Sequence, residues 1–447
     1  MPRPMQTPMT STAPFLAALV GAALLGVACG GGGDADGRDG PPTVRTGAAA
    51  APVASTRRSD DPRAVELREL LEFGHLARAR ALLAVGLEGL GLEGELLRAR
   101  AAALAGDATT LARRIEAARA LNADDPRVYA TAAELHAAAG RFETAGSELE
   151  RGRRACGPTA ELLRAQGVVL LCQDGGAAAG LRLLEQALAV DPTLPFTARA
   201  RSQAHLLLGR EAFATQAPSV ALDHALRAVL FDPEEIDARR FLADVRGARG
   251  ELEEALAILE ELVAEGRPLE GELAMLCRRA ALASIVRGAR EPGARERGLD
   301  LFVRARDLGL SAAELGSGAA ILAGAAAVAE EEGLEAYEGG DRVLAAERFE
   351  RALRLDPERL AARNHLAVVL FRAEDFAGAA RHWATVLEQA RSAGVELPEP
   401  VHLNLARALS RAGDAAGARE VLTAALERAP EGPWAEDSRR ALRAIDP

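Results

Sequence analysis

The side chains that could carry covalent or acid–base chemistry are few in this 447-residue chain and lie far apart. All 54 residues counted as lysine or arginine are arginine, because the sequence contains no lysine. A Walker A loop, a Schiff-base enzyme and a Ser-x-x-Lys acyl-transfer site each require lysine, so these classes are excluded. His365 and His382 fall on different predicted helices, without a carboxylate or cysteine at ligand spacing. We therefore expect no catalytic residue, no metal site and no cofactor.

Three of the four cysteines lie within the helical part of the chain. Cys156 is placed at the end of one predicted helix and Cys172 near the far end of the next. At the rise of an α-helix they are about 18 Å apart, so no disulfide is expected between them. We expect these two thiols and Cys277 to be small buried hydrophobes rather than reactive groups.

The fourth, Cys29, follows an apolar stretch from Ala13 to Ala28 that is too short to span a membrane as a mature helix. This segment resembles the bacterial lipoprotein signal, in which a cysteine after small residues is lipidated and becomes the new N-terminus. The resemblance implies a signal peptide over residues 1–28 and lipidation of Cys29. The family usually has a branched aliphatic residue three places before the cysteine, where this chain has Gly26. Ordinary cleavage after Ala28, giving a soluble periplasmic or secreted protein, is the alternative.

Residues 29–60 are rich in Gly, Ala, Pro and Asp and lack apolar periodicity, which predicts a solvated tether. A lipidated Cys29 would join this tether to the membrane of the cell envelope. Gly30 is not the aspartate that resembles an inner-membrane retention signal, so we expect the outer membrane or the periplasmic side.

A helical-hairpin pattern recurs about every 34 residues over residues 61–430 and predicts about ten hairpins. The units align on ten turn residues, which are Gly74, Gly106, Gly140, Gly175, Gln216, Gly250, Gly293, Gly340, Glu374 and Gly413. Where the turn residue is glycine, it supplies the positive φ that ends the first helix. The steps around Gly293 and Gly340 are longer and indicate extended helices or insertions within residues 269–340.

Each unit also places a small residue five positions after the turn and a larger apolar residue four positions later. The small residues are Ala145, Gly180, Ala221, Ala255, Ala345, Ala379 and Ala418, and the larger ones are Leu149, Leu184, Leu259, Phe349, Trp383 and Leu422. The small side chain lets the two helices approach, and the larger one lies on the same helix face and fills the space between hairpins. Prolines then end many units, at Pro126, Pro158, Pro192, Pro233, Pro357 and Pro430.

These repeats resemble the tetratricopeptide repeat (TPR) family, most clearly in residues 140–158, 374–390 and 412–430. The resemblance implies an all-α fold, an α-solenoid of stacked antiparallel helix hairpins that form a superhelix. Residues 431–447 are expected to form a capping helix. In this family the first helix of each hairpin lines a concave groove. The corresponding groove residues of the last two units are Asn364, Arg372, Asn404, Arg407 and Arg411.

The expected role is a non-catalytic scaffold of the cell envelope that binds a protein or peptide partner in this groove. A net charge of −11 and only 3% aromatic residues argue against a nucleic-acid partner. Two alternatives remain open. One is an assembly factor for a pilus, secretion or outer-membrane machine, and the other is an envelope enzyme built on a helical-repeat scaffold.

Overall fold

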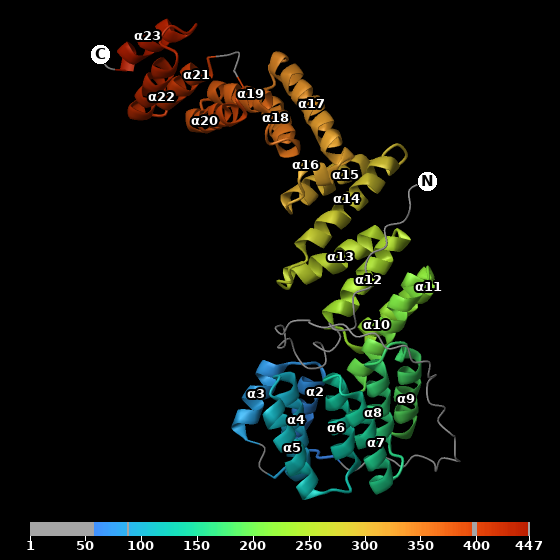
Figure 1. Ribbon diagram of the computed structural model, residues 1–447. Helices are drawn as coiled ribbons and strands as arrows, with labels where there is room; N and C mark the ends of the chain where they lie inside the picture. Colours follow the sequence, from blue (N-terminus) through green and yellow to red (C-terminus); the bar gives the residue numbers. More distant parts are fainter. Residues whose placement is uncertain (1–57, 87–88, 396–399, 446–447) are drawn as a thin grey trace, which may run out of the picture. The chain divides into compact units, whose positions relative to one another are not determined.

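The computed structural model describes residues 58–86, 89–395 and 400–445, and every regular element in these ranges is a helix (Figure 1). The predicted signal peptide, Cys29 and the tether up to residue 57 lie outside the described residues. The chain divides into two compact units after Ile258. No helix of the described residues combines the length and the apolar composition that crossing a membrane requires.

Unit 1 is a series of antiparallel hairpins in which each helix packs on the next. The hairpins are α2 (Pro62–Glu72) with α3 (Leu76–Val85), α4 (Gly91–Leu104) with α5 (Ala108–Leu121), α6 (Pro126–Ala138) with α7 (Phe142–Cys156), α8 (Ala160–Leu171) with α9 (Ala177–Val190), and α10 (Ala198–Ala214) with α11 (Pro218–Phe231). Helix α12 (Ile236–Arg249) follows, and the division between the units falls within α13 (Leu252–Ala264).

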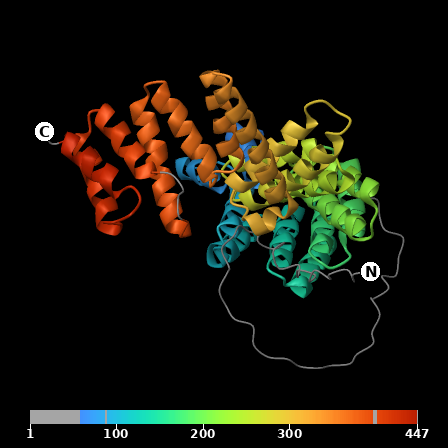
Figure 2. The same ribbon diagram turned by 90° about the horizontal axis from the view of Figure 1, so that it is seen from above.

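Unit 2 repeats the arrangement, and its orange to red helices form a row of antiparallel neighbours in Figure 2. Its hairpins are α14 (Glu270–Arg287) with α15 (Ala294–Asp307), α17 (Ser317–Glu338) with α18 (Arg342–Leu355), α19 (Leu360–Arg372) with α20 (Phe376–Ala393), and α21 (Val401–Arg411) with α22 (Ala415–Arg428). The long helices α14 and α17 and the short α16 (Ala312–Leu315) account for the longer repeat steps in this region. The predicted all-α fold of stacked antiparallel hairpins is confirmed within each unit.

The hairpin turns have the backbone conformation that the repeat alignment requires. All ten aligned turn residues lie between two helices and have φ between 60° and 91°, including the non-glycine residues Gln216 and Glu374. At four turns the next residue is an aspartate whose side chain accepts a hydrogen bond from the first turn of the second helix, namely Asp107, Asp341, Asp375 and Asp414. The left-handed residue therefore ends one helix and the aspartate caps the next.

The small and large apolar positions of the repeat form the core. The seven small residues and the six larger ones named above are all buried. At Gly180 a Cβ atom would lie 2.9 Å from the carbonyl oxygen of Gly167, so α8 and α9 touch through their backbones. Close helix approach therefore depends on the small residue, as the spacing predicts.

The C-terminal helix α23 (Ala435–Ile445) packs on the last hairpin. Its apolar residues Leu442 and Ile445 contact the cluster that contains Leu403 and Leu422. Its Ser438 is buried and donates a hydrogen bond to the carbonyl of Trp434 at 2.9 Å. The helix therefore covers apolar surface of α21 and α22.

Candidate functional site

The first helices of successive hairpins in unit 1, α2, α4, α6, α8 and α10, pack against one another and bring charged residues onto one face. Three of these residues, Glu93, Arg127 and Glu161, recur at intervals of 34 residues and so occupy equivalent positions of three hairpins. We call this surface the charged face and define it by the residues Arg68, Glu72, Glu93, Arg100, Arg127, Glu134, Glu161 and Arg164.

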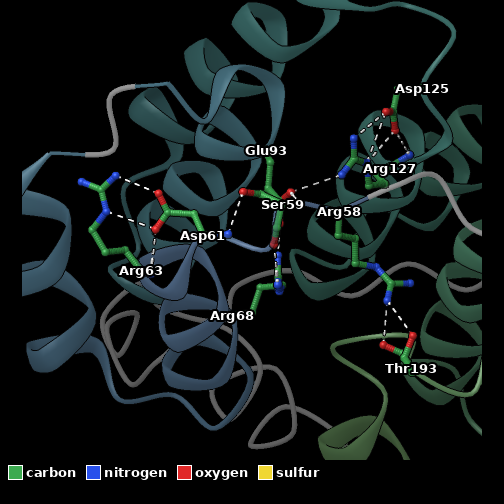
Figure 3. Close-up of polar contacts among 9 residues, drawn as sticks. All are labelled: Arg58, Ser59, Asp61, Arg63, Arg68, Glu93, Asp125, Arg127 and Thr193. Carbon is green, nitrogen blue, oxygen red and sulfur yellow. Dashed lines mark hydrogen bonds and ion pairs between the residues drawn. The ribbon is translucent and has the colours of Figure 1, made fainter.

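One ion-pair chain of the charged face runs from α2 to α6 through Glu93 (Figure 3). Glu93 pairs with Arg68 of α2, and its Oε2 lies 3.5 Å from Nη1 of Arg127. Arg127 in turn pairs with Asp125 at 2.8 Å. Opposite charges thus alternate along the stacked helices, and each side chain has a partner that fixes its position.

A second network is centred on Glu134, which is 6% exposed. Its Oε2 lies 2.5 Å from Nη2 of Arg100, and its Oε1 lies 2.8 Å from Nε of Arg164. Burial by itself raises the pKa of Glu134, but the charges of Arg164 and Arg100 outweigh burial and lower that pKa. Glu134 therefore stays ionised and holds two guanidinium groups in fixed directions.

The charged face holds a piece of the chain's own backbone just before α2. Glu93 Oε2 accepts a hydrogen bond from the Ser59 backbone N–H at 2.7 Å, and Arg68 donates to the Ser59 carbonyl at 3.0 Å. Arg58 donates to the carbonyl of Thr193 at 2.7 Å (Figure 3). It also pairs with Asp191. Arg58 and Ser59 fall in the predicted tether of residues 29–60. Ser59 thus contacts side chains of α2 and α4, and Arg58 contacts the loop after α9.

The charged face also holds the loop between α9 and α10. Glu72 accepts hydrogen bonds from the backbone N–H groups of Phe196 at 2.9 Å and Ala198 at 2.8 Å. Arg164 donates to the carbonyl of Pro195 at 2.8 Å. These bonds connect residues up to 126 positions apart in the sequence. Charged side chains of the first helices therefore bind main-chain groups of the segment before α2 and of the α9–α10 loop, together with the first residue of α10.

An open cavity of about 810 Å³ lies beside these contacts. Its wall combines residues of α2 with residues of the α9–α10 loop and of α10, among them Val65, Glu69, Glu72, Thr193 and Arg201. The guanidinium of Arg201 lies 3.6 Å from the ring centre of Phe231, which orients it by a cation–π contact. The cavity offers both carboxylates and guanidinium groups to a bound segment.

The five groove residues expected from the family resemblance lie on α19 and α21 in unit 2. One of them is buried, Asn404 is half-buried and three are exposed. Asn364 is buried, and its Oδ1 accepts a hydrogen bond from Nε1 of Trp383 at 2.8 Å. The amide oxygen of Asn364 is therefore bonded to a core side chain, and the expected role of this residue in a groove stays a prediction. Among the described residues, no carboxylate pairs with Arg372, Arg407 or Arg411, which are exposed.

Asn404, Arg407 and Arg411 recur at three- and four-residue spacing and share one face of α21. A groove of about 700 Å³ lies on the opposite face of α21, between α20 and α22, and Leu405 and Leu409 line it. None of the five expected residues lines that groove. Their role in peptide binding stays a prediction.

The cysteines have the character expected of small apolar residues. Cys156, Cys172 and Cys277 are unpaired, and Cys277 is buried while the other two are half-buried. Burial, the largest cause, raises the pKa of each thiol to about 11. Within the described residues, no group of three or more His, Cys, Asp or Glu is arranged to hold a metal ion.

The sequence interpretation missed the charged face, although one signal for it was present. The 34-residue spacing of Glu93, Arg127 and Glu161 could have been found by aligning the first helices of the hairpins. Glu72 and Phe196 carried no such signal, because their contact joins hairpins that are distant in sequence.

Comparison with known proteins gives structural similarity without an assignment to a family. No known family model matches the chain, and no curated protein matches it. The TPR2AB domain of yeast Sti1, in its pHSP90 complex, is 17% identical and aligns over 55% of this chain and 98% of that chain, with a TM-score of 0.26. The human IFIT1 dimer with m7Gppp-AAAA is 17% identical over 87% of this chain and 86% of that chain, with a TM-score of 0.25.

The TPR domain of P58(IPK) is 15% identical over 87% of this chain and 99% of that chain, with a TM-score of 0.24. The hairpin architecture described above rests on the contacts between the chain's own helices and not on these alignments.

Proposed function

We propose that this protein is a non-catalytic scaffold that binds a partner protein through the charged face of unit 1. The observation that carries the proposal is a set of hydrogen bonds to the backbone of non-helical segments. Arg68 and Arg164 donate to carbonyl groups, and Glu72 and Glu93 accept from N–H groups. A surface that binds main-chain N–H and C=O groups can hold a peptide segment largely independently of its side chains. The open cavity beside these contacts leaves room for such a segment.

Charged side chains held in fixed positions are well suited to bind a peptide backbone. Hydrogen bonds to charged groups contribute about 1.5–3 kcal/mol each, more than bonds between neutral groups. The charged face orients its side chains through ion pairs before a partner arrives, so less side-chain entropy is lost on binding. This smaller loss of entropy favours binding of a partner peptide.

The test uses two valines of unit 1 that differ in position. Val65 is 39% exposed and lines the cavity, whereas Val85 is 77% exposed and lines none of the cavities described for unit 1. Peptides are selected from a random display library on the full mature chain, and their affinities are measured for Val65→Arg and Val85→Arg.

We expect Val65→Arg to weaken the selected peptides at least tenfold and Val85→Arg to leave them unchanged. Arg407→Glu in unit 2 is measured in parallel, since Arg407 belongs to the groove expected from the family resemblance. Loss of binding in Arg407→Glu with full binding in Val65→Arg would place the site on α21 and contradict the assignment to unit 1.

We further propose that the scaffold is anchored in the bacterial cell envelope by lipid on Cys29. This rests on the apolar segment that precedes Cys29 and on the tether composition that follows it. Metabolic labelling with a palmitate analogue should mark the wild type and not Cys29→Ala. Absence of label from both would favour the soluble periplasmic or secreted form.

An assembly factor is a specialised form of the same scaffold. The two roles are distinguished by whether partners co-purify with the protein in a fixed ratio. A component of a pilus, secretion or outer-membrane machine should co-purify from solubilised membranes with partners in fixed ratio. A general peptide binder should not.

A further inference from the structure

The α9–α10 loop differs from the other loops of unit 1 in length. Helix α9 ends at Val190 and α10 begins at Ala198, which leaves seven residues. The loops after α11 and α18 also begin with Asp-Pro but have only four residues, since α11 ends at Phe231 and α12 begins at Ile236, and α18 ends at Leu355 and α19 begins at Leu360. The three additional residues bring Phe196 to the charged face.

Phe196 adopts a backbone conformation that bulky residues rarely adopt. Its φ is 61°, in the left-handed region that disfavours side chains with a Cβ. Most of the other positive-φ positions in the described chain are glycines, and the remaining two are Gln216 and Glu374 at hairpin turns. The surrounding contacts of Phe196 must therefore compensate for an unfavourable φ.

Those contacts form a pocket for an aromatic side chain. The guanidinium carbon of Arg100 lies 3.9 Å from the centre of the Phe196 ring, and that of Arg164 lies 5.8 Å from it. The ring also packs against the apolar cluster of α2 and α4 that contains Leu71 and Leu97. Arg100 and Arg164 are held by Glu134, so the pocket is ordered by residues outside the loop.

The main chain around Phe196 is bound in the manner of a peptide ligand. Glu72 accepts from the N–H groups of Phe196 and Ala198, while Arg164 donates to the Pro195 carbonyl. A carboxylate for N–H groups, a guanidinium for a carbonyl and a pocket for a ring are together sufficient to recognise a short peptide. Leu194 anchors the loop separately, in a cluster with Ala160 and Ala187.

We propose that the α9–α10 loop is a resident ligand of the charged face. The external ligand of the same pocket is then a short non-helical peptide with an aromatic residue directly after a proline, as in Pro195-Phe196. Such a peptide enters in place of the loop, and Phe196 relaxes to a common backbone conformation when it leaves. This inference rests on the proposed function. It adds the chemistry of the partner peptide and states that the α9–α10 loop occupies the binding pocket when no peptide is bound.

The test supplies the loop in trans. The probe is a fluorescein-labelled peptide with the sequence of residues 191–198, DPTLPFTA, and its affinity is measured by fluorescence anisotropy on the full chain. The variant Phe196→Gly empties the pocket and keeps a residue that tolerates the positive φ. We expect Phe196→Gly to bind the probe at least tenfold more tightly than the wild type does.

Two controls assign the binding to the pocket. A peptide with alanine in place of its phenylalanine should not bind Phe196→Gly. Adding Glu72→Gln to Phe196→Gly should weaken the original probe at least tenfold, because a neutral amide replaces the charged acceptor of two N–H groups.

Equal affinity of the probe for the wild type and Phe196→Gly, or no binding to either, would overturn the inference. Loss of the helical circular dichroism signal in Phe196→Gly would show that the ring is needed for folding. Phe196→Leu, which retains an apolar side chain, is then measured instead. If Phe196→Leu folds and does not bind the probe more tightly than the wild type, the inference is overturned. These failures leave the proposed function intact if peptides selected on the wild type still depend on Val65.

Discussion

At the scale of single residues, one polar side chain is used by the core where the family resemblance places it in a groove. Asn364 lies in α19, and its amide oxygen accepts the indole N–H of Trp383 in a buried setting. Trp383 is the large apolar residue of its repeat, and its indole N–H needs an acceptor once it is buried. The repeat pattern predicted the position of Trp383 but not that Asn364 would satisfy its N–H.

Replacing Asn364 by alanine leaves the indole N–H of Trp383 buried without an acceptor. We expect the free energy of unfolding to fall by about 1–3 kcal/mol. Tryptophan fluorescence during urea unfolding measures the change, since Trp383 and Trp434 are the only tryptophans of the chain. Arg407→Ala on the exposed face of α21 is the control and should change stability by less than about 0.5 kcal/mol. Equal stability of Asn364→Ala and the wild type would show that Asn364 does not stabilise the core and would favour its expected role in the groove.

A second residue-scale prediction concerns the buried His205 and the half-buried His224, whose Nδ1 atoms lie 2.9 Å apart. Burial, together with the charges of His224, Arg227 and Arg201, lowers the pKa of His205 from 6.5 to about 4. The unfolded chain therefore binds a proton as the pH falls through 6.5, whereas the folded chain does not until about pH 4. Acidification from pH 7 to 4.5 should thus remove about 2 kcal/mol of stability through His205.

The measurement compares the wild type with His205→Gln by thermal or urea unfolding at pH 7 and pH 4.5, followed by circular dichroism. The variant should lose less stability than the wild type between these two pH values. The same loss in both proteins would show that the pKa of His205 does not differ between the folded and unfolded states.

At the scale of helices and turns, the local sequence was sufficient to predict the positions of the hairpin turns. The turns at Gln216 and Glu374 lack glycine, yet Ala221 and Ala379 five residues later fixed their register, and both turns have positive φ. The α9–α10 loop could not be predicted in the same way. Its conformation depends on Glu72 and Arg100, which are distant in sequence, in addition to hydrogen bonds within the loop.

Glu374→Gly should stabilise unit 2, because glycine adopts a φ of 66° without the steric cost that glutamate incurs. We expect a gain of about 0.5–1 kcal/mol in the free energy of unfolding, read by tryptophan fluorescence in urea. The reciprocal variant Gly340→Glu, at a turn with a φ of 83°, should destabilise by a similar amount. Destabilisation by Glu374→Gly would indicate that the glutamate side chain makes a contribution that the described contacts do not include.

At the scale of the whole chain, the repeat pattern predicts where helices pack and leaves open which surface binds. The family resemblance selected the first helices of the last two units, where Arg407 and Arg411 are exposed. The structure adds a charged face on the first helices of unit 1, where fixed ion pairs and bound backbone segments occur together. A face of this kind depends on contacts between hairpins, so no single repeat carries its signature.

The most direct test of the central claim is hydrogen–deuterium exchange of the full chain with and without a peptide selected on it. Binding at the charged face should slow exchange of the amides in residues 62–72 and leave residues 401–411 unchanged. Exchange in residues 193–198 should also change: it slows if the peptide binds beside the loop, and it becomes faster if the peptide replaces the loop and releases the N–H groups of Phe196 and Ala198. Slower exchange confined to residues 401–411, with no change in residues 62–72 and 193–198, would contradict the claim that unit 1 holds the partner.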